Sequence, residues 1–199
     1  GMDGPVRENP EELISRLLCA RVYLLWNGGI GTYVKASTES HTDVGDKSND
    51  SLRVDATQLR CRVIGEGGNL GMTQLSRVEY GLAGGRSNTD FVDNAGGVDC
   101  SDHEVNIKIL LNGVVARGDL TEKHRNVLLA EMTDSIAELV LSNNYHQVQA
   151  ISMAQFQAFE RAGEYQRFIS AFEQAGSLNR KLEFLPSDEE LLERRVKGQ

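Results

Sequence analysis

Residues 61–75 read CRVIGEGGNLGMTQL, a short apolar run followed by four glycines and a threonine. This order predicts a strand over 61–66, a glycine loop, and a helix that Thr73 begins and that ends near Ala83. A strand that leads through a glycine loop into a helix is a building unit of α/β folds, and such a loop can bind a phosphate group. The stretch therefore predicts an α/β fold and raises the question of a dinucleotide site.

A unit of the same kind precedes this stretch. Residues 22–26 form a continuous apolar run, which predicts a parallel strand buried on both faces, and the run ends in the glycine-rich loop 27–31. The segment 36–60 is polar and weakly periodic, so we expect a long excursion there, with a small hairpin around Asp55.

A third unit follows the opening stretch. A strand is predicted at 87–92, a glycine loop at 93–97, and a further helix from about Asp102. Repeated strand, glycine loop and helix predict right-handed βαβ units and a parallel sheet. Ligands bind at the carboxyl ends of the strands in such sheets, and we expect the three glycine loops to cluster there.

Helical periodicity marks the remaining elements. Leu75, Val78 and Leu82 recur at spacings of three and four, which predicts one buried stripe on the helix after Thr73. From Leu120 onward no strand-like run remains, so we expect only helices there, the last of them begun by a capping motif after Pro186.

Bulk composition narrows the classes of function. The net charge is −8 over 199 residues, and the densest positive stretch is the short run 193–197, so we expect no nucleic-acid partner. No apolar run approaches the roughly 20 residues that span a bilayer. The three separate cysteines predict reduced thiols, so we expect a soluble, cytoplasmic protein with no membrane partner. Gly1-Met2 resembles the remnant of a cleaved expression tag, which raises the prospect of a piece of a longer protein.

The glycine loop 65–71 departs from the dinucleotide fingerprint G-x-G-x-x-G. Gly65 and Gly67 fit the pattern, but Leu70 stands where the third glycine must let helix and strand pack closely. The loop also follows at least the second strand, whereas the pyrophosphate loop belongs after the first. The motif alone therefore favours a tight turn at the mouth of the sheet over a pyrophosphate site.

Three asparagines are more informative than the glycines. Asn27, Asn69 and Asn94 each lie in a glycine loop at the end of a predicted strand. A side-chain amide offers two donors and an acceptor without charge, which suits a carboxamide or ribose hydroxyls. Since glycine lets the backbone approach a ligand closely, the three loops predict a crevice for a small ligand.

The run DCSDH at 99–103 contains the side chains of a nucleophilic site in consecutive positions. Consecutive side chains diverge and cannot form a triad, so helix capping by Ser101 or Asp102 is favoured over catalysis. A ligand contact from the capping hydroxyl is compatible with both interpretations. Cys100 and His103 have no partner at zinc-site spacing, and we expect no metal site.

Longer motifs connect the chain with a known family. They are LLWNGGIGTYVKASTESHTDVGD at 24–46, GEGGNLGMTQ at 65–74, DNAGGVDCSDHEVNIKILLN at 93–112 and EFLPSDEE at 183–190. From about Pro10 to Arg195 the chain resembles the large NAD-specific glutamate dehydrogenases of bacteria. The resemblance implies oxidative deamination of L-glutamate to 2-oxoglutarate and ammonium with NAD as cofactor, by an enzyme expected to be a homo-oligomer at full length.

The resemblance also implies roles for single residues. Asn69 resembles an asparagine on the nicotinamide side of the cofactor, and Asn94 resembles one near both nicotinamide and substrate. Val98 and Ser101 resemble residues of the glutamate pocket, with the serine hydroxyl toward the side-chain carboxylate. Asp99 replaces a threonine of the shorter glutamate dehydrogenases, which changes the shape of that pocket. The implied cofactor-binding set is Asn27, Gly28, Gly67, Gly68, Asn69 and Asn94, and the implied substrate-binding set is Asn94, Val98 and Ser101.

In the family, the catalytic lysine and aspartate and the pyrophosphate loop precede everything in this chain. The resemblance therefore implies a fragment with no catalytic residue of its own and no activity alone. The strand at 22–26 would then lack its neighbour in a doubly wound sheet, and we expect its free edge to be covered by a local segment or another chain. The alternative function is a non-catalytic nucleotide-binding or interaction module.

The expected fold class is α/β: the second half of a doubly wound, Rossmann-like parallel sheet, followed by an all-α region. In chain order we expect a tag remnant and flexible start at 1–9, the C-terminal half of an NAD-binding domain at 10–117, and a C-terminal helical region at 118–199.

Overall fold

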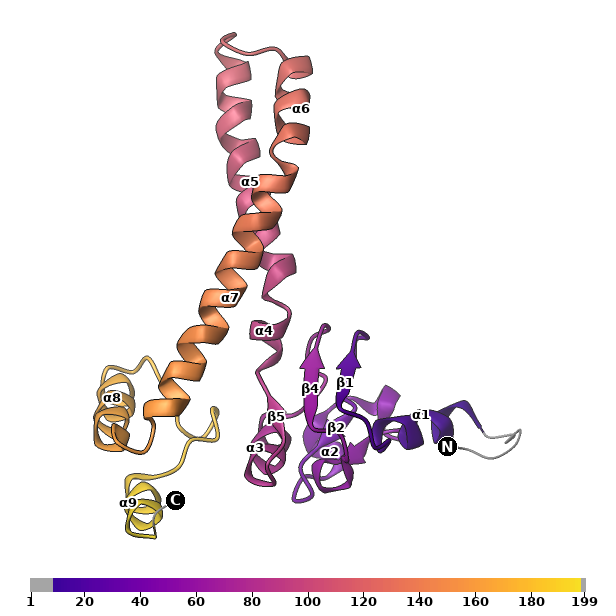
Figure 1. Ribbon diagram of the computed structural model, residues 1–199, viewed down its shortest axis with the longest axis vertical. Helices are drawn as coiled ribbons and strands as arrows, with labels where there is room; N and C mark the ends of the chain where they lie inside the picture. The colour runs from indigo at the N-terminus through magenta and orange to yellow at the C-terminus, as the bar shows by residue number, and fades with distance from the viewer. Residues whose placement is uncertain (1–8, 198–199) are drawn as a thin grey trace. The chain divides into compact units, whose positions relative to one another are not determined.

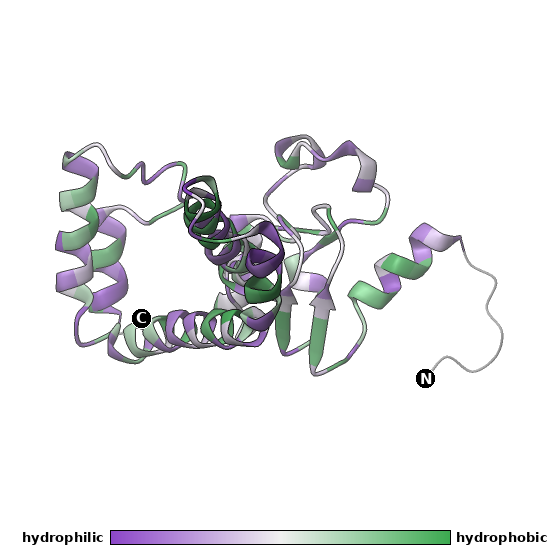
Figure 2. Cartoon of the chain, turned by 90° about the horizontal axis from the view of Figure 1, so that it is seen from above, coloured by the Kyte–Doolittle hydropathy of each residue, from purple (hydrophilic) through white to green (hydrophobic). Residues whose placement is uncertain are grey.

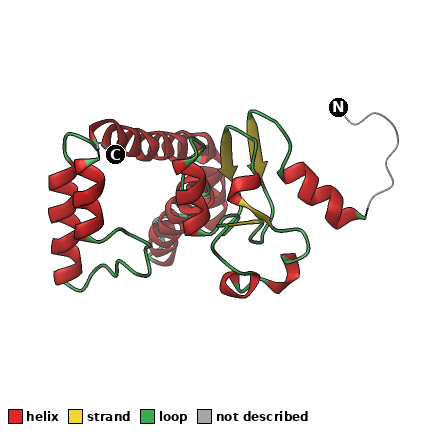
Figure 3. Ribbon diagram, turned by 90° about the horizontal axis from the view of Figure 1, so that it is seen from below, coloured by secondary structure: helices red, strands yellow, loops and turns green. Residues whose placement is uncertain are grey.

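The computed structural model describes residues 9–197. The chain divides into two compact units, Gly1–Gln147 and Val148–Gln199. The first unit contains all the described strands, and the second is helical (Figure 3). The expected tag remnant and flexible start at 1–9 lie outside the described residues except for Asn9.

A small parallel sheet organises the first unit. Its strands are β1 (Leu24–Asn27), β4 (Val63–Glu66) and β5 (Arg86–Ser87), in the order β1-β4-β5 (Figure 1). Leu24 pairs with Val63 and Val63 pairs with Arg86, both in parallel register. The predicted strands at 22–26 and 61–66 are confirmed, as is the parallel α/β class. Figure 2 shows that β1 and β4 are mainly apolar.

The first strand is less buried than its apolar run predicted. Leu24 and Trp26 are both more than half exposed. These two side chains lie on one face of β1, so the prediction of a strand buried on both faces is wrong for this chain. No strand among the described residues pairs with the outer edge of β1. The physical reason is that β1 is an edge strand, with a neighbour on one side only.

The prediction for residues 87–97 is also wrong. After the short β5, Thr89 has extended backbone and α4 (Asp90–Asp93) begins, so most of the expected strand is a helical turn that buries Val92. The expected glycine loop is absent as well, because α5 (Ala95–Ala116) begins directly after Asn94 rather than near Asp102. A glycine in a helix costs only about 1 kcal/mol relative to alanine, which packing can offset.

The polar segment 36–60 is folded rather than irregular. It contains α2 (His41–Val44) and two 3-10 turns, η1 (Lys47–Asn49) and η2 (Ala56–Gln58). Its strand β3 (Val54–Asp55) pairs with β2 (Val34–Lys35), and the pairing is parallel. The expected hairpin around Asp55 is therefore wrong, since the strands of a hairpin are antiparallel.

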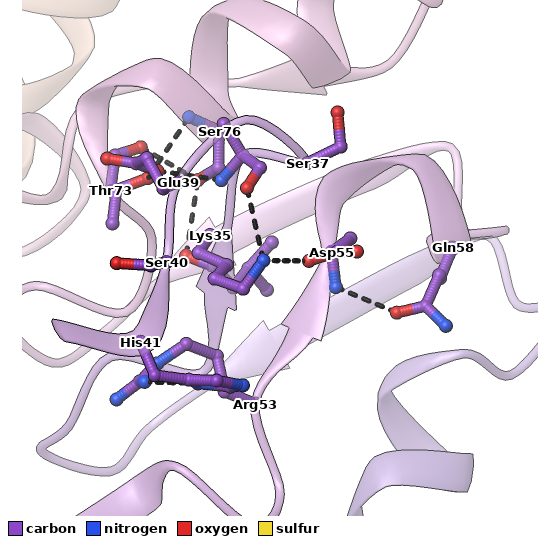
Figure 4. A network of polar contacts seen from close by, with 12 residues as sticks. Lys35, Ser37, Glu39, Ser40, His41, Arg53, Asp55, Gln58, Thr73 and Ser76 are labelled. Carbon is purple, nitrogen blue, oxygen red and sulfur yellow. Dashed lines mark hydrogen bonds and ion pairs between the residues drawn. The ribbon is translucent and has the colours of Figure 1, made fainter. Parts of the chain in front are cut away.

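A buried polar network holds this segment in place (Figure 4). The ammonium group of Lys35, on a side chain that is 10% exposed, forms an ion pair with Asp55. The guanidinium of Arg53 is fully buried; it donates to the carbonyl oxygen of Thr32 at 2.7 Å and to Asp50 at 2.6 Å. Burying these cations without partners would cost several kcal/mol, so the paired carboxylates and carbonyls are what allow a charged segment to pack here.

The hydrophobic core lies between the two sheets and helix α3 (Gln74–Leu82). It consists of Val34, Val54, Ala56, Cys61, Ile64, Met72 and Tyr80. Thr73 begins α3 as predicted, since its hydroxyl accepts a hydrogen bond from the backbone N–H of Ser76 at 3.1 Å. The buried stripe was predicted wrongly: Val78 and Leu82 are exposed, and the buried face carries Ser76 and Tyr80.

Helices make up the other elements. In the first unit α1 (Pro10–Leu18) begins at Asn9, whose side chain accepts from Glu11 N–H. Helix α5 turns back into α6 (Glu122–Glu131), and Arg125 of α6 donates to Asn112 of α5 at 2.7 Å. Helix α7 (Thr133–Gln157) follows and extends into the second unit, which also contains α8 (Ala162–Gln174) and α9 (Asp188–Val196). The prediction of helices only after Leu120 is confirmed for the described residues.

Candidate functional site

Two loops meet at the carboxyl ends of β1 and β4. The backbone N–H groups of Gly67 and Gly68 donate to the carbonyl oxygen of Asn27 at 2.8 and 3.2 Å. A Cβ on Gly68 would stand 2.3 Å from the carbonyl oxygen of Gly29, a distance that backbone atoms cannot tolerate. Glycine is therefore required at 68, where the loops pack against one another, while a Cβ on Gly67 would meet the ring of Trp26 instead. Asn27 and Gly28 lie in the loop on the other side of this contact.

Asn69 follows this contact and faces the start of α5. Its side-chain oxygen accepts a hydrogen bond from the amide of Asn94. The next residue, Leu70, has left-handed backbone with φ of 58°, and its N–H donates to Asp90 at 2.8 Å. The two amides come from different elements, since Asn69 follows β4 and Asn94 stands between α4 and α5. The fold thus brings together two of the three predicted asparagines in direct contact.

Helix α5 extends this surface. Val98 and Ser101 lie four and seven residues after Asn94, a spacing that places the three on one face of a helix. Val98 is 65% exposed, and Ser101 is exposed as well. An early start of α5 is what gives this alignment, because a helix that began at Asp102 would have left all three residues in a loop.

A cavity of about 390 Å³ opens between these elements in the first unit. Asn69, Asn94 and Val98 line it, and so does Asp99, whose replacement of a threonine the sequence had connected with the pocket. The other lining residues were not assigned to this site from the sequence; they are Phe91, Ala95, Asp102 and Gln147. The other predicted residues, Asn27, Gly28, Gly67, Gly68 and Ser101, are not among its lining residues. Asp99 and Asp102 lie four and seven residues after Ala95 and so share its face of α5, which would have indicated them, had the start of α5 been placed correctly.

Asp99 is held in the cavity wall by helix α7. Its carboxylate accepts a hydrogen bond from the amide of Asn143 at 2.8 Å, and the His103 ring nitrogen Nε2 lies 3.5 Å from its other oxygen. Asn144 of the same helix donates to the carbonyl oxygen of Val92 at 2.9 Å, which ties α7 to α4. The cavity therefore combines three neutral amides, two carboxylates and the apolar side chains of Phe91 and Val98.

The rest of the described chain has a further hollow. A hollow of about 460 Å³ lies in the second unit between α8 and α9, and it contains none of the predicted site residues. Within residues 9–197, no group of three His, Cys, Asp or Glu side chains is arranged to hold a metal ion. None of the helices in that range has both the length and the apolar character needed to cross a membrane.

Comparison with known proteins connects this geometry with one family. The family model described as the catalytic domain of bacterial NAD-glutamate dehydrogenase matches residues 5–154. The NAD-specific glutamate dehydrogenase of Pseudomonas aeruginosa is 68% identical over 190 residues, which cover 96% of this chain and 12% of that protein.

Two further relatives carry the same name. The protein of Halomonas elongata is 62% identical over 186 residues, and that of Mycobacterium tuberculosis is 48% identical over 203 residues. These alignments cover 94% and 100% of this chain and in each case 12% of the relative. The chain thus spans about one eighth of the length of these relatives. On this identity and on the matched family model, the chain belongs to the bacterial NAD-glutamate dehydrogenases, within their catalytic domain.

Proposed function

We propose that the chain is a fragment of an NAD-dependent glutamate dehydrogenase and forms the nicotinamide and glutamate side of its cleft. The complete enzyme converts L-glutamate, NAD and water to 2-oxoglutarate, ammonium and NADH. The observation that carries the proposal is the contact of Asn69 with Asn94 at the wall of one cavity, in a chain of this family.

The chemistry of the cavity fits the nicotinamide end of the cofactor. A nicotinamide carries a carboxamide, whose donor and acceptor match the side-chain amides of Asn69 and Asn94. The exposed apolar side chains of Phe91 and Val98 offer surface for a flat ring at the same cavity. When bound, NAD supplies the acceptor for the hydride that leaves the substrate.

The remaining predicted residues have supporting roles in this proposal. Asn27, Gly28, Gly67 and Gly68 form the paired loops against which the cofactor lies. Val98 and Ser101 face the glutamate, with the serine hydroxyl toward the side-chain carboxylate. The catalytic lysine and aspartate belong to the part of the enzyme that precedes this chain, so the fragment alone is inactive.

The same proposal includes the larger architecture. The three parallel strands are the second half of a doubly wound, Rossmann-like sheet, residues 10–117 belong to the NAD-binding domain, and 118–199 form a helical region. The complete enzyme works in the cytoplasm as a homo-oligomer. The order β1-β4-β5, with one free edge on the strand that comes first in the chain, supports this arrangement.

The test is steady-state kinetics of the full-length enzyme. Asn69→Ala and Asn94→Ala are expected to raise KM for NAD about tenfold or more, since each removes a hydrogen-bonding amide and leaves its partners unpaired. Ser101→Ala is expected to raise KM for glutamate and to leave KM for NAD nearly unchanged.

Matched controls lie outside the cavity. Asn126→Ala on α6 and Ser152→Ala on α7 replace the same residue types at exposed helical positions and should change neither constant. If Asn69→Ala and Asn94→Ala leave KM for NAD unchanged, this cavity is not the nicotinamide site, and the alternative of a non-catalytic binding module is favoured.

A further inference from the structure

A buried ion-pair cluster lies behind the loop that carries Asn69. Arg77 of α3 holds the carboxylate of Glu66 with two parallel hydrogen bonds of 2.8 and 3.0 Å, and Glu66 is fully buried at the end of β4. The same guanidinium lies 3.3 Å from Asp90 of α4. One cation therefore joins two carboxylates that come from different elements.

Both carboxylates also hold the backbone of the loop. Glu66 accepts from the N–H of Met72 at 3.2 Å, and Asp90 accepts from the N–H of Leu70 at 2.8 Å. Leu70 has left-handed backbone, which costs a residue with a side chain about 1 kcal/mol or more and persists only where its surroundings impose it. The cluster thus imposes the turn that directly follows Asn69.

The position of the Asn69 amide depends on this turn. The N–H of Leu70 belongs to the peptide group of Asn69, so Asp90 fixes the orientation of that peptide. Arg77 itself is not among the residues that line the cavity. Any effect of Arg77 on a ligand there must therefore pass through the loop.

We propose that Arg77 is a positioning residue of the nicotinamide site, which sets the place of the Asn69 amide through Glu66 and Asp90. This inference rests on the proposed function of the cavity. A purely structural role makes a different prediction. Loss of Arg77 would leave a buried carboxylate unpaired and lower the stability of the fold, and any change in NAD binding would not depend on Asn69.

The two roles are separated by a double-mutant cycle in the full-length enzyme. Arg77→Gln is expected to raise KM for NAD up to about tenfold, which is the effect expected of removing the Asn69 amide itself, because a misplaced binding group loses its contact with the ligand. In the Asn69→Ala background the same change should raise KM by less than about twofold, because the group that Arg77 positions is already gone. If Arg77→Gln does not accumulate as folded protein, Asp90→Ala replaces it in the cycle. This variant keeps the pair of Glu66 and Arg77, removes the acceptor for the Leu70 N–H, and should change KM for NAD in the same way.

The matched control is Arg180→Gln in the second unit. Arg180 is as little exposed as Arg77, at 11% against 10%, and it too pairs with two carboxylates, Glu173 and Asp188. The Arg180→Gln variant should leave KM for NAD unchanged.

The possible results have distinct meanings. If Arg77→Gln and Asp90→Ala raise KM for NAD as much in the Asn69→Ala enzyme as in the parent, the positioning role is overturned and the proposed function still stands. An Asn69→Ala enzyme with normal KM for NAD would overturn the proposed function itself.

Discussion

At the scale of single residues, Tyr80 shows how one side chain fixes the packing of α3. Its ring is 4% exposed, and its hydroxyl donates to the carbonyl oxygen of Cys61 at 3.0 Å. A Cβ on Gly85 would stand 2.3 Å from the ring, so the chain passes directly beside it. Burial, and next the neighbouring Cys61, raise the pKa of Tyr80 well above its usual value near 10.

The raised pKa predicts an alkaline loss of stability that Tyr80→Phe lacks. Above about pH 10 the unfolded chain releases the Tyr80 proton while the folded chain keeps it, so the free energy of unfolding falls as pH rises. At neutral pH, Tyr80→Phe should cost about 1 kcal/mol through its lost hydrogen bond. The difference in the free energy of unfolding between the parent and Tyr80→Phe should then become smaller above pH 10. Urea unfolding, followed by the fluorescence of Trp26, the only tryptophan, measures the cost at neutral pH and its change above pH 10.

The control for this prediction is Tyr145→Phe, whose ring is 65% exposed. Because Tyr145 is exposed, its replacement should change the free energy of unfolding little at neutral pH. If the difference in the free energy of unfolding between the parent and Tyr80→Phe stays constant as pH rises, the buried hydroxyl does not titrate differently in the folded and unfolded states.

At the scale of elements, the sequence predicted what local signals encode. Thr73 and Ser187 each begin a helix because a side-chain oxygen accepts a free N–H, and the sequence predicted both starts. The apolar runs at β1 and β4 likewise predicted parallel strands. Asn69 lies in the loop at the carboxyl end of β4, where the general rule for parallel sheets places it, but Asn94 contacts it from the turn between α4 and α5 and not from the end of a strand.

What the sequence did not predict depends on tertiary packing. Phe91 and Val92 resemble the middle of a strand, yet they form a helical turn because Asp90 and Asp93 hold the N–H groups of Leu70 and Glu66. The buried face of α3 was missed because Ser76 is polar; it is fully buried since its hydroxyl bonds to the carbonyl oxygens of Val34 and Thr73. Apolar periodicity cannot register a polar side chain that finds its partners within the fold.

The start of α5 gives a prediction for this element. Gly97 lies inside the helix, and the nearest atom to an added Cβ is the Asn94 side-chain oxygen at 4.0 Å. Gly97→Ala should therefore raise the free energy of unfolding by up to about 1 kcal/mol. Thermal unfolding followed by circular dichroism measures this.

Gly118→Ala serves as the opposite control. Gly118 follows α5 with a φ of +82°, a backbone conformation that strains any other residue, so alanine there should lower stability. Destabilisation by Gly97→Ala as well would indicate that residues 95–97 form the glycine loop that the sequence alone predicted.

At the scale of the whole molecule, β1 lies at the edge of its sheet and has backbone groups on its outer side. The carbonyl oxygens of Tyr23 and Asn27 accept hydrogen bonds from Val63 and Gly67, so these residues face β4. Because backbone groups alternate along a strand, those of Leu24 and Trp26 face outward. No described strand pairs with them. The chain spans only 12% of the length of its relative from Pseudomonas aeruginosa.

We expect a strand of the full-length enzyme to pair with this edge, which gives the last prediction. In the chain of 199 residues the amides of Leu24 and Trp26 should exchange rapidly with deuterium, since solvent reaches them. In the full-length enzyme their exchange should slow at least about tenfold, because each amide is then hydrogen-bonded. Hydrogen-exchange mass spectrometry of peptides over 22–27 measures the difference, and peptides over β4, which is already paired on both sides, should be protected in both proteins. Equal exchange at 22–27 would mean that the edge of β1 stays open to water in the complete enzyme and that this sheet is not half of a larger one.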